Sequence, residues 1–221
     1  MEDSGMQNGS KKWAGLMRGL RTLILIGLTM AATSAYSASK TVLVLGDSLS
    51  AEYGLARGTG WLSLLQKRLQ TEKVNAEFVN ASISGETTSG GKSRLDALLA
   101  QQHPAVVIIE LGANDGLRGL SLAASEANLR AMIAASHKAK ARVLLIGMRL
   151  PPNYGRDYTQ KFSAMYAKLA KESNTALVPF FLAGLENRPE LFQADRLHPT
   201  ADGQAIMLDN VWPHLKPLLT K

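Results

Sequence analysis

Short apolar runs alternate with longer stretches of helical spacing along most of the chain. The runs occupy residues 41–45, 76–80, 105–111, 142–148 and 176–180. Two of them, "AVVIIEL" and "RVLLIGM", are almost continuously apolar, which is typical of strands that are covered on both faces of a parallel sheet. The pattern therefore predicts five strands, most of them buried.

The stretches between these runs carry apolar residues three or four positions apart, which is the spacing of one helix face. In "WLSLLQKRLQ", for example, Trp61, Leu65 and Leu69 fall on the same side. Further helices are expected over residues 91–101, 122–141, 157–172 and 202–219. Five repeats of strand and helix without a linker predict one α/β domain, a three-layer α/β/α sandwich around a five-stranded, mainly parallel sheet.

The first 38 residues have the pattern of an export signal. A basic start precedes the apolar run "LILIGLTMAA", and the small residues of "TSAYSAS" follow it. Because a membrane span needs about 20 apolar residues, we expect cleavage after Ala35, Ser37 or Ala38, although an uncleaved anchor is the alternative and Met6 is a second possible start. The domain over residues 39–221 would then be periplasmic or secreted, with no stable membrane span.

Charge and cysteine content change this picture little. The formal net charge is +7, of which the first 38 residues supply two charges through four basic and two acidic residues. The remaining basic residues are scattered, so nucleic-acid binding is not expected. The chain has no cysteine, and no cluster of histidines has the spacing of metal ligands. We therefore expect no disulfide, no metal and no other cofactor, and we expect a monomer.

Ligands in such folds bind beyond the carboxyl ends of the parallel strands. The loops after the first four strands are rich in small and polar residues and read "GDSLSAEYG", "ASISGETTSGG", "GANDGLRG" and "RLPPNYGRD". They are expected to meet on one rim, with Ser48 near its centre. Ser48 could be a nucleophile there, or the Gly-Asp-Ser sequence could simply close the strand with a turn.

A serine hydroxyl needs a base before it can attack a carbonyl group near neutral pH. His103, His137 and His214 are expected at surface or helix positions, whereas His198 follows the last strand in "DRLHPTADG". Asp195 lies three residues earlier, where a turn brings the two side chains together and the carboxylate can orient the imidazole. An aspartate before a helix is also a common cap, so the pair alone is a weak signal.

An acyl-transfer site also needs hydrogen-bond donors for the oxyanion that develops on the carbonyl group. The candidates are the backbone N–H of Ser48, the backbone N–H of Gly85 in "SISGE" and the side-chain amide of Asn114 in "GANDG". Taken singly, Gly85 and Asn114 are more typical of turns. Their value as candidates lies in their origin at different strand ends.

The blocks "GDSLS", "SISGETT", "GANDG" and "DRLHP" stand in the order of the four sequence blocks of the GDSL, or SGNH, hydrolases, and the chain resembles this family from residue 40 to its end. "ELGANDGLRGL" and "RLPPNYG" are similar to the subgroup of bacterial thioesterase I, also described as protease I and lysophospholipase, and its arylesterase relatives. The resemblance implies a flavodoxin-like fold. It also implies that Ser48 is the nucleophile, His198 the base and Asp195 its orienting partner, with Ser48, Gly85 and Asn114 forming the oxyanion hole.

The resemblance further implies a mobile loop that helps to cover the acyl group. Leu117 and Leu120 of "DGLRGL" and Leu150 and Tyr154 of "RLPPNYG" are the candidate substrate-binding residues, and they could equally be ordinary loop anchors.

Three positions depart from the family pattern. Glu52 and Arg196 each stand where glycine is frequent, and Glu86 replaces a frequent aspartate. Arg196 bears on the turn geometry and the electric field near His198. Glu52 bears on the charge of the rim and therefore on substrate preference.

Other chemistries fit the sequence less well. "SGGKS" at residues 89–93 resembles the end of a phosphate-binding loop, but the required first glycine would fall on Glu86. The "G-x-S-x-G" elbow of α/β-hydrolases is absent because residue 50 is a serine. A non-catalytic lipid- or carbohydrate-binding module on the same fold is the alternative function. We expect an exported serine hydrolase that cleaves acyl esters, thioesters or lysophospholipids.

Overall fold

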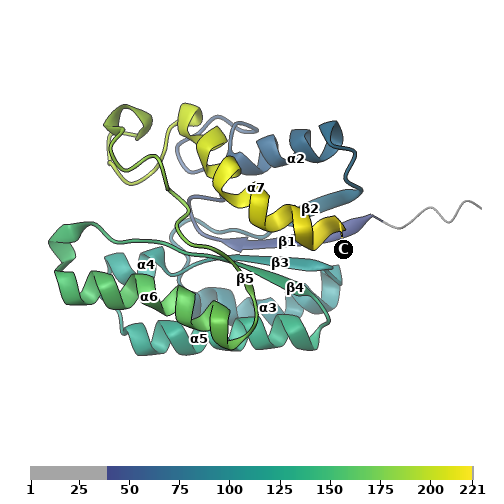
Figure 1. The fold of residues 1–221 in the computed structure, drawn as a ribbon, viewed down its shortest axis with the longest axis horizontal. Helices are drawn as coiled ribbons and strands as arrows, with labels where there is room; N and C mark the ends of the chain where they lie inside the picture. Colours follow the sequence, from purple (N-terminus) through teal and green to yellow (C-terminus); the bar gives the residue numbers. More distant parts are fainter. Residues whose placement is uncertain (1–38, 221) are drawn as a thin grey trace, which may run out of the picture. The chain divides into compact units, whose positions relative to one another are not determined.

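The computed structural model describes residues 39–220, which fold around a five-stranded parallel sheet. The strands are β1 (Lys40–Gly46), β2 (Ala76–Asn80), β3 (Val106–Glu110), β4 (Arg142–Ile146) and β5 (Ala176–Val178). Their order across the sheet is β2-β1-β3-β4-β5 (Figure 1). The order reverses between β1 and β3, and open α/β sheets bind ligands at such a switch point.

The centre of the sheet is the core of this domain. Val42, Leu43, Val44 and Leu45 of β1 are 0% exposed, and they pair in parallel register with residues 106–109 of β3. Both faces of these strands must therefore be covered, which explains why their sequences are continuously apolar rather than alternating.

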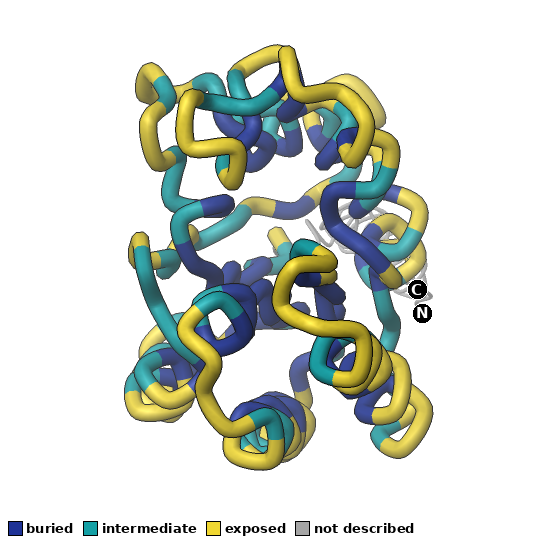
Figure 2. The backbone as a smooth tube through the Cα atoms, turned by 90° about the vertical axis from the view of Figure 1, so that its left-hand side faces the viewer, coloured by how far each residue is buried: buried dark blue, intermediate teal, exposed yellow. Residues whose placement is uncertain are grey.

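Helices cover the sheet on both sides (Figure 1). One face carries α2 (Trp61–Thr71) and α7 (Gln204–Thr220), and the other carries α3 (Thr88–Gln102), α5 (Leu122–Lys138) and α6 (Arg156–Glu172). Figure 2 shows buried backbone along the strands and on the inner sides of the helices, with exposed backbone at the outer turns. The expected α/β/α sandwich is confirmed.

Two local differences from the predicted elements matter for the site. Helix α3 begins at Thr88, earlier than predicted, because the Thr87 side chain accepts a hydrogen bond from Gly90 N–H and caps the helix. The "SGGKS" segment therefore lies inside a helix rather than in a phosphate-binding loop. The short helix α4 (Ala113–Leu117) was not predicted, since five residues with one glycine carry no helical periodicity.

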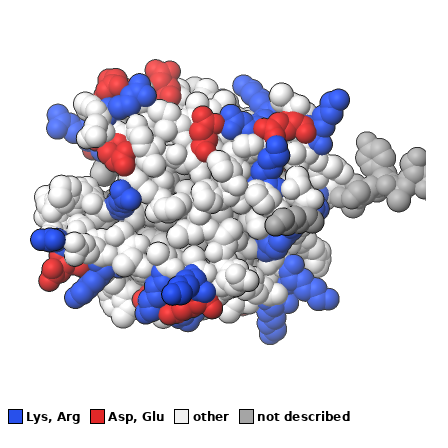
Figure 3. Space-filling model, in the orientation of Figure 1, with Lys and Arg blue, Asp and Glu red and all other residues white. Residues whose placement is uncertain are grey.

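The surface shown in Figure 3 carries basic and acidic side chains interspersed with one another. Within residues 39–220, no helix has the length and apolar character that crossing a membrane requires. The predicted export signal lies outside the described residues, and the domain boundary at residue 39 stays a prediction.

Candidate active site

Ser48 lies just after β1, where the chain leaves the sheet in a tight turn. The Leu49 N–H donates to Asp47 Oδ1 at 3.0 Å, which holds the turn closed. Gly46 is required immediately before it, since a Cβ at this position would lie 2.7 Å from Glu110 Oε2. The turn leaves Ser48 at the edge of a cavity rather than inside the core.

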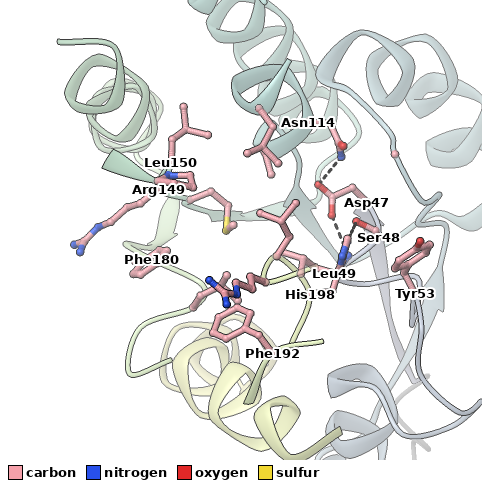
Figure 4. Close-up of a pocket in the computed structure, with 18 of the residues that line it drawn as sticks. Asp47, Ser48, Leu49, Tyr53, Asn114, Arg149, Leu150, Phe180, Phe192 and His198 are labelled. Carbon is pink, nitrogen blue, oxygen red and sulfur yellow. Dashed lines mark hydrogen bonds between the residues drawn. The ribbon is translucent and has the colours of Figure 1, made fainter. Parts of the chain in front are cut away.

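The imidazole of His198 reaches Ser48 on one side and Asp195 on the other. Its Nε2 is 2.8 Å from Ser48 Oγ (Figure 4), and its Nδ1 is 2.6 Å from Asp195 Oδ2. The N–H groups of Leu197 and His198 donate to Asp195 Oδ1 at 2.9 and 3.0 Å. Partial burial would raise the pKa of Asp195, but these hydrogen bonds and the imidazole outweigh it and lower the pKa. Asp195 is therefore an ionised group that can orient the imidazole and stabilise its protonated form.

Three residues that carry candidate hydrogen-bond donors line the same cavity as the Ser48 hydroxyl. Within residues 39–220, the backbone N–H groups of Ser48 and Gly85 donate to no protein acceptor. Gly85 has a φ of +78°, which favours glycine. The Asn114 amide Nδ2 lies 3.0 Å from Glu86 O and 3.2 Å from Asp47 Oδ2. The structure thus brings together the three residues that the sequence predicted as donors, and the Asn114 amide is held in place by two acceptors of the protein.

Asn114 owes its position to the anchoring of α4. The helix starts after Gly112, whose φ is +116° and where a Cβ would collide with the Tyr166 hydroxyl. The next residue, Asp115, is buried, and its carboxylate accepts hydrogen bonds from Thr88 N at 2.9 Å and Thr88 Oγ1 at 2.5 Å. These contacts tie α4 to the start of α3 and fix the direction of the Asn114 side chain.

Two buried carboxyl groups lie beneath the Ser48 turn, and the sequence did not single out either of them. Asp47 is 1% exposed and Glu110 is 0% exposed. Burial raises the pKa of Asp47 to about 6, and burial together with the neighbouring Asp47 raises the pKa of Glu110 well above its ordinary value. In the sequence, Asp47 is part of a turn motif and Glu110 is simply the polar end of an apolar strand.

A mostly apolar cavity of about 590 Å³ opens beside Ser48 and His198. This volume lies in the range of small-molecule sites. Its apolar lining comes from the rim loops (Figure 4) and consists of Leu49, Ala113, Leu117, Met148, Leu150, Pro151, Pro152, Phe180, Leu182, Phe192 and Leu197. Its exposed charged lining residues are Arg149, Glu186 and Arg196. The cavity suits a substrate with an apolar chain next to the reacting group.

The four candidate substrate-binding residues fall into two pairs. Leu117 and Leu150 line the cavity, whereas Leu120 and Tyr154 do not. Leu120 is 43% exposed, and its carbonyl accepts a hydrogen bond from the Tyr158 hydroxyl at 3.1 Å. The Tyr154 hydroxyl donates to Leu117 O at 3.1 Å. Leu120 and Tyr154 therefore belong to the contacts that anchor the loop after α4, not to the cavity wall.

Several residues at the site carry no signal in the sequence. The Tyr53 ring lies beside the His198 imidazole, with ring centroids 4.6 Å apart (Figure 4). Phe180 and Phe192 enter the cavity wall from the segment after β5, whose course depends on tertiary folding.

Glu52, the first departure from the family pattern, points to the loop and not to the cavity. It adopts a φ of +57°, and its carboxylate accepts hydrogen bonds from Gly58 N at 3.0 Å, Gly60 N at 2.8 Å and Ser63 Oγ at 3.1 Å. Partial burial opposes ionisation, but these donors lower the pKa of Glu52. Glu52 therefore ties the loop after Ser48 to the start of α2.

Arg196 and Glu86 leave the site geometry in place. Arg196 takes a φ of +58° between Asp195 and His198, and the hydrogen bonds on either side of the imidazole still form. Glu86 pairs with Arg94 at 2.9 Å. In the part of the chain that the structure describes, no group of three or more His, Asp or Glu side chains is arranged to hold a metal ion.

Comparisons with known proteins agree with this geometry. The sequence profile of the GDSL-like Lipase/Acylhydrolase family matches residues 44–206. Esterase TesA of Pseudomonas aeruginosa is 49% identical over 201 residues, which cover 90% of this chain and 100% of that protein. Thioesterase 1/protease 1/lysophospholipase L1 of Escherichia coli is 43% identical over 197 residues, covering 89% of this chain and 91% of that protein. An arylesterase of Vibrio mimicus is 42% identical over 185 residues, covering 84% and 92%.

Solved structures give the same result at the level of the fold. The crystal structure of TesA superposes with a TM-score of 0.80 at 52% identity, covering 81% of this chain and 100% of that one. The psychrotrophic esterase EstA from Pseudoalteromonas, inhibited by monoethylphosphonate, superposes with a TM-score of 0.78 at 40% identity, covering 83% and 100%. The profile match, the identities and the fold agree, and the chain therefore belongs to the GDSL-like lipase/acylhydrolase family and is an acyl hydrolase.

Proposed function

We propose that this acyl hydrolase is an exported serine esterase and thioesterase that works through an acyl-enzyme on Ser48. The proposal rests above all on the contacts from Asp195 through His198 to Ser48, at 2.6 and 2.8 Å, beside an apolar cavity. A carboxylate, an imidazole and a hydroxyl in this order activate a serine for attack on a carbonyl group.

In the first half of the proposed reaction, Ser48 Oγ attacks the carbonyl carbon of the substrate while its proton passes to His198 Nε2. Asp195 accepts a hydrogen bond from Nδ1–H and stabilises the imidazolium. The oxyanion of the tetrahedral intermediate accepts hydrogen bonds from the free N–H groups of Ser48 and Gly85 and from the Asn114 amide. Both amide hydrogens of Asn114 are donated within the protein, to Glu86 O and Asp47 Oδ2, so the hydrogen bond to Glu86 O is exchanged for the one to the oxyanion. The imidazolium then protonates the departing alcohol or thiol, and the acyl group stays on Ser48.

In the second half, a water molecule attacks the acyl-enzyme while His198 Nε2 takes its proton. The same donors hold the second oxyanion, and collapse of this intermediate returns the proton to Ser48 Oγ and releases a carboxylic acid. The inhibition of EstA by monoethylphosphonate supports this chemistry by analogy, because a phosphonyl group is tetrahedral like the intermediate.

The substrates that fit best are acyl esters and thioesters, including lysophospholipids. The apolar cavity can take the acyl chain, with Leu117 and Leu150 in its wall. The names of the relatives, which include an esterase, a thioesterase with lysophospholipase activity and an arylesterase, cover the same substrate classes.

The proposed site of action is the periplasm or the exterior of a bacterial cell, after removal of an export signal within residues 1–38. The apolar segment "LILIGLTMAA" and the small residues after it support export. N-terminal sequencing of the exported protein tests this part, and a start between residues 36 and 39 is expected.

The test of the catalytic proposal compares the wild type with the Ser48→Ala variant on p-nitrophenyl esters of increasing acyl length. Ser93→Ala is the matched control, because Ser93 is exposed on α3 outside the cavity lining and its hydroxyl donates to Gly90 O at 2.7 Å. Turnover by Ser48→Ala is expected to fall about 10⁴- to 10⁶-fold, as in other serine triads, and the control should stay close to wild type. Undiminished turnover by Ser48→Ala would overturn the mechanism. Absence of turnover by the wild type on every ester would favour a non-catalytic binding module.

A further inference from the structure

The buried carboxyl pair beneath Ser48 joins the ends of two neighbouring strands. Gly46 of β1 pairs in register with Glu110 of β3, so Asp47 leaves the sheet directly beside the Glu110 side chain. Both acids are almost completely buried, the Asp47 N–H donates to Glu110 Oε2 at 3.2 Å, and the interaction of the two carboxyl groups contributes to the raised pKa of Glu110. Burying a charged carboxyl group costs free energy. Two buried acids that do not take part in the proposed reaction therefore call for a structural explanation.

One oxygen of Glu110 is fully engaged, and the other is not. Oε2 accepts hydrogen bonds from Ser50 Oγ at 2.8 Å and from Asp47 N–H at 3.2 Å. The indole N–H of Trp61 donates in turn to Ser50 Oγ at 3.2 Å. Oε1 is buried and accepts a hydrogen bond from no donor within residues 39–220. A proton on Oε1 would satisfy this buried atom, because Oε1–H could then donate a hydrogen bond to the Asp47 carboxylate.

The Asp47 carboxylate is surrounded by groups that favour its ionised form over that of Glu110. Oδ1 accepts Leu49 N–H at 3.0 Å and Oδ2 accepts the Asn114 amide at 3.2 Å. The imidazole of His198 also acts on Asp47, and its positive charge when protonated favours the carboxylate. No cationic side chain of the described residues contributes to the pKa shift of Glu110. Two neighbouring buried carboxyl groups can share one negative charge, because a like charge disfavours ionisation of the second group.

The other titratable groups around the pair supply no proton. On α6, the Tyr166 hydroxyl donates to Leu111 O at 3.1 Å, and burial raises its pKa well above its usual range. On α4, the Asp115 carboxylate is occupied by the N–H and hydroxyl groups of Thr88. The single proton of the pair is therefore held between Asp47 and Glu110 themselves.

We propose that Glu110 is a proton-bearing positioning residue, whose Oε1–H donates to Asp47 so that Asp47 holds the Asn114 amide beside Ser48. The inference rests on the proposed function, since it assigns Asn114 to the oxyanion hole. When Glu110 is neutral, the Asp47–Glu110 pair carries one negative charge, not two, near the oxyanion that develops in the reaction. It also fixes the turn through Ser50 and the Asp47 N–H, which sets the direction of the Ser48 N–H donor.

The test uses two variants at Glu110 in the full chain. In Glu110→Gln the amide can donate to Asp47 and its oxygen can accept from Ser50, as in protonated glutamic acid. Glu110→Met has a similar volume and can do neither. Ser136→Ala is the control for a general loss of stability, because the Ser136 hydroxyl is buried far along α5 and donates to Met132 O at 2.8 Å.

We expect kcat of Glu110→Gln to stay within about threefold of wild type, and kcat of Glu110→Met to fall at least about tenfold with little change in KM. This loss is smaller than the 10²- to 10³-fold cost of deleting an oxyanion donor outright. Ser136→Ala should lower the melting temperature without lowering kcat. A Glu110→Gln variant as impaired as Glu110→Met would overturn the proposal.

An infrared difference spectrum between wild type and Glu110→Gln tests the proton directly. At about pH 8, where ordinary carboxyl groups with a pKa near 4 are ionised, the wild type should retain a C=O stretching band of a protonated carboxylic acid that the variant lacks. Absence of this band would overturn the inference even if Ser48→Ala abolishes turnover. Full activity of Ser48→Ala would instead overturn the proposed function, so the two failures are distinguishable.

Discussion

The two sides of the site around Ser48 are built in different ways. On the base side, Asp195 and His198 are three residues apart in one loop, and the turn between them supplies the contact. On the donor side, Gly85 and Asn114 come from separate strand ends, and Asn114 is held through the buried Asp47. The base side is formed by contacts within one loop and is partly exposed, whereas the donor side depends on the register of the sheet.

This difference decides how each side responds to substitution. An exposed turn relaxes around a changed side chain, so a substitution there acts through the chemistry of the group that is lost. A buried network leaves unpaired polar groups when one member is removed, so a substitution there costs both stability and geometry. Substitutions on the two sides should therefore differ in their effects on kcat and on melting temperature.

The largest effect is expected from Asp195→Asn on the base side. An asparagine can donate to His198 Nδ1 and so favour the tautomer that cannot accept the Ser48 proton. We expect kcat to fall about 10³- to 10⁴-fold with little change in melting temperature. Asp202→Asn, an exposed aspartate in the same segment, is the control and should keep wild-type kcat. A loss below tenfold would show that Asp195 does not orient the base.

The second effect is expected from Asn114→Ala on the donor side. Removal of the amide takes away one of the proposed oxyanion donors, and kcat should fall about 10²- to 10³-fold while KM changes little. The Asp47 carboxylate also loses a hydrogen bond inside the protein, so stability should fall as well. Asn153→Ala, at an exposed position, provides the control for kcat and melting temperature. Loss of kcat without loss of stability would contradict the contrast between the two sides.

The third effect concerns the pH dependence of stability in Glu110→Gln. Because burial raises the folded-state pKa of Glu110 above its ordinary 4.5, the unfolded chain releases this proton at lower pH than the folded chain. The wild type should therefore lose stability relative to the variant as pH rises above this value, by about 1.4 kcal/mol per pH unit until pH passes the folded-state pKa. Urea unfolding at about pH 4 and about pH 7 measures the difference in unfolding free energy between the wild type and the variant. A difference that stays constant with pH would refute a raised pKa of Glu110.

The fold could be predicted from the sequence, and the residues of the base side could be proposed from it, because both inferences depend on local signals. Continuous apolar runs predicted the buried strands, and Ser48, Asp195 and His198 stand in short motifs at strand ends. Glu110 gave no such signal, because its role arises from pairing with Gly46 across the sheet. Its acidic side chain ends an apolar strand, and only the register shows that it faces the Ser48 turn.

The cavity wall was harder to predict than the polar groups, for a physical reason. An apolar side chain packs equally well in a core, in a loop anchor or in a groove, and the sequence does not distinguish these environments. Residues 117 and 120 are both leucines in the same loop segment, yet only Leu117 lines the cavity. Phe180 and Phe192 reach the wall through the path of the segment after β5, which no motif specified.

A smaller effect is expected at Tyr53, which belongs to the base side. The ring beside His198 can stabilise the imidazolium that forms during the reaction, by about 0.5–1 kcal/mol at an exposed site. Tyr53→Ala should therefore lower kcat/KM about two- to fivefold, whereas Tyr53→Phe should keep the wild-type value because the ring is retained. Steady-state kinetics on a p-nitrophenyl ester measure both variants. Equal losses in the two variants would assign the effect to the hydroxyl and not to the ring.

The smallest effect is expected from Arg196→Gly, which changes the backbone of the base side without removing a reacting group. Arg196 has a φ of +58°, a conformation that costs a residue with a side chain about 1–2 kcal/mol. Glycine removes this cost. Its greater conformational freedom in the unfolded chain lowers the free energy of unfolding by about 0.5–1 kcal/mol. The net result should be a gain in unfolding free energy of about 0–1.5 kcal/mol.

Lys140→Gly is the matched variant, because Lys140 has a φ of +64° and lies away from the cavity. Both variants should gain stability by similar amounts in urea unfolding, since the same backbone strain is relieved. Only Arg196→Gly should also change the dependence of kcat/KM on substrate charge, because Arg196 lines the cavity. If Arg196→Gly gained stability but lost kcat on a neutral ester, the arginine would be needed to hold the Asp195–His198 turn, and the base side would be less independent of its surroundings than its local contacts indicate.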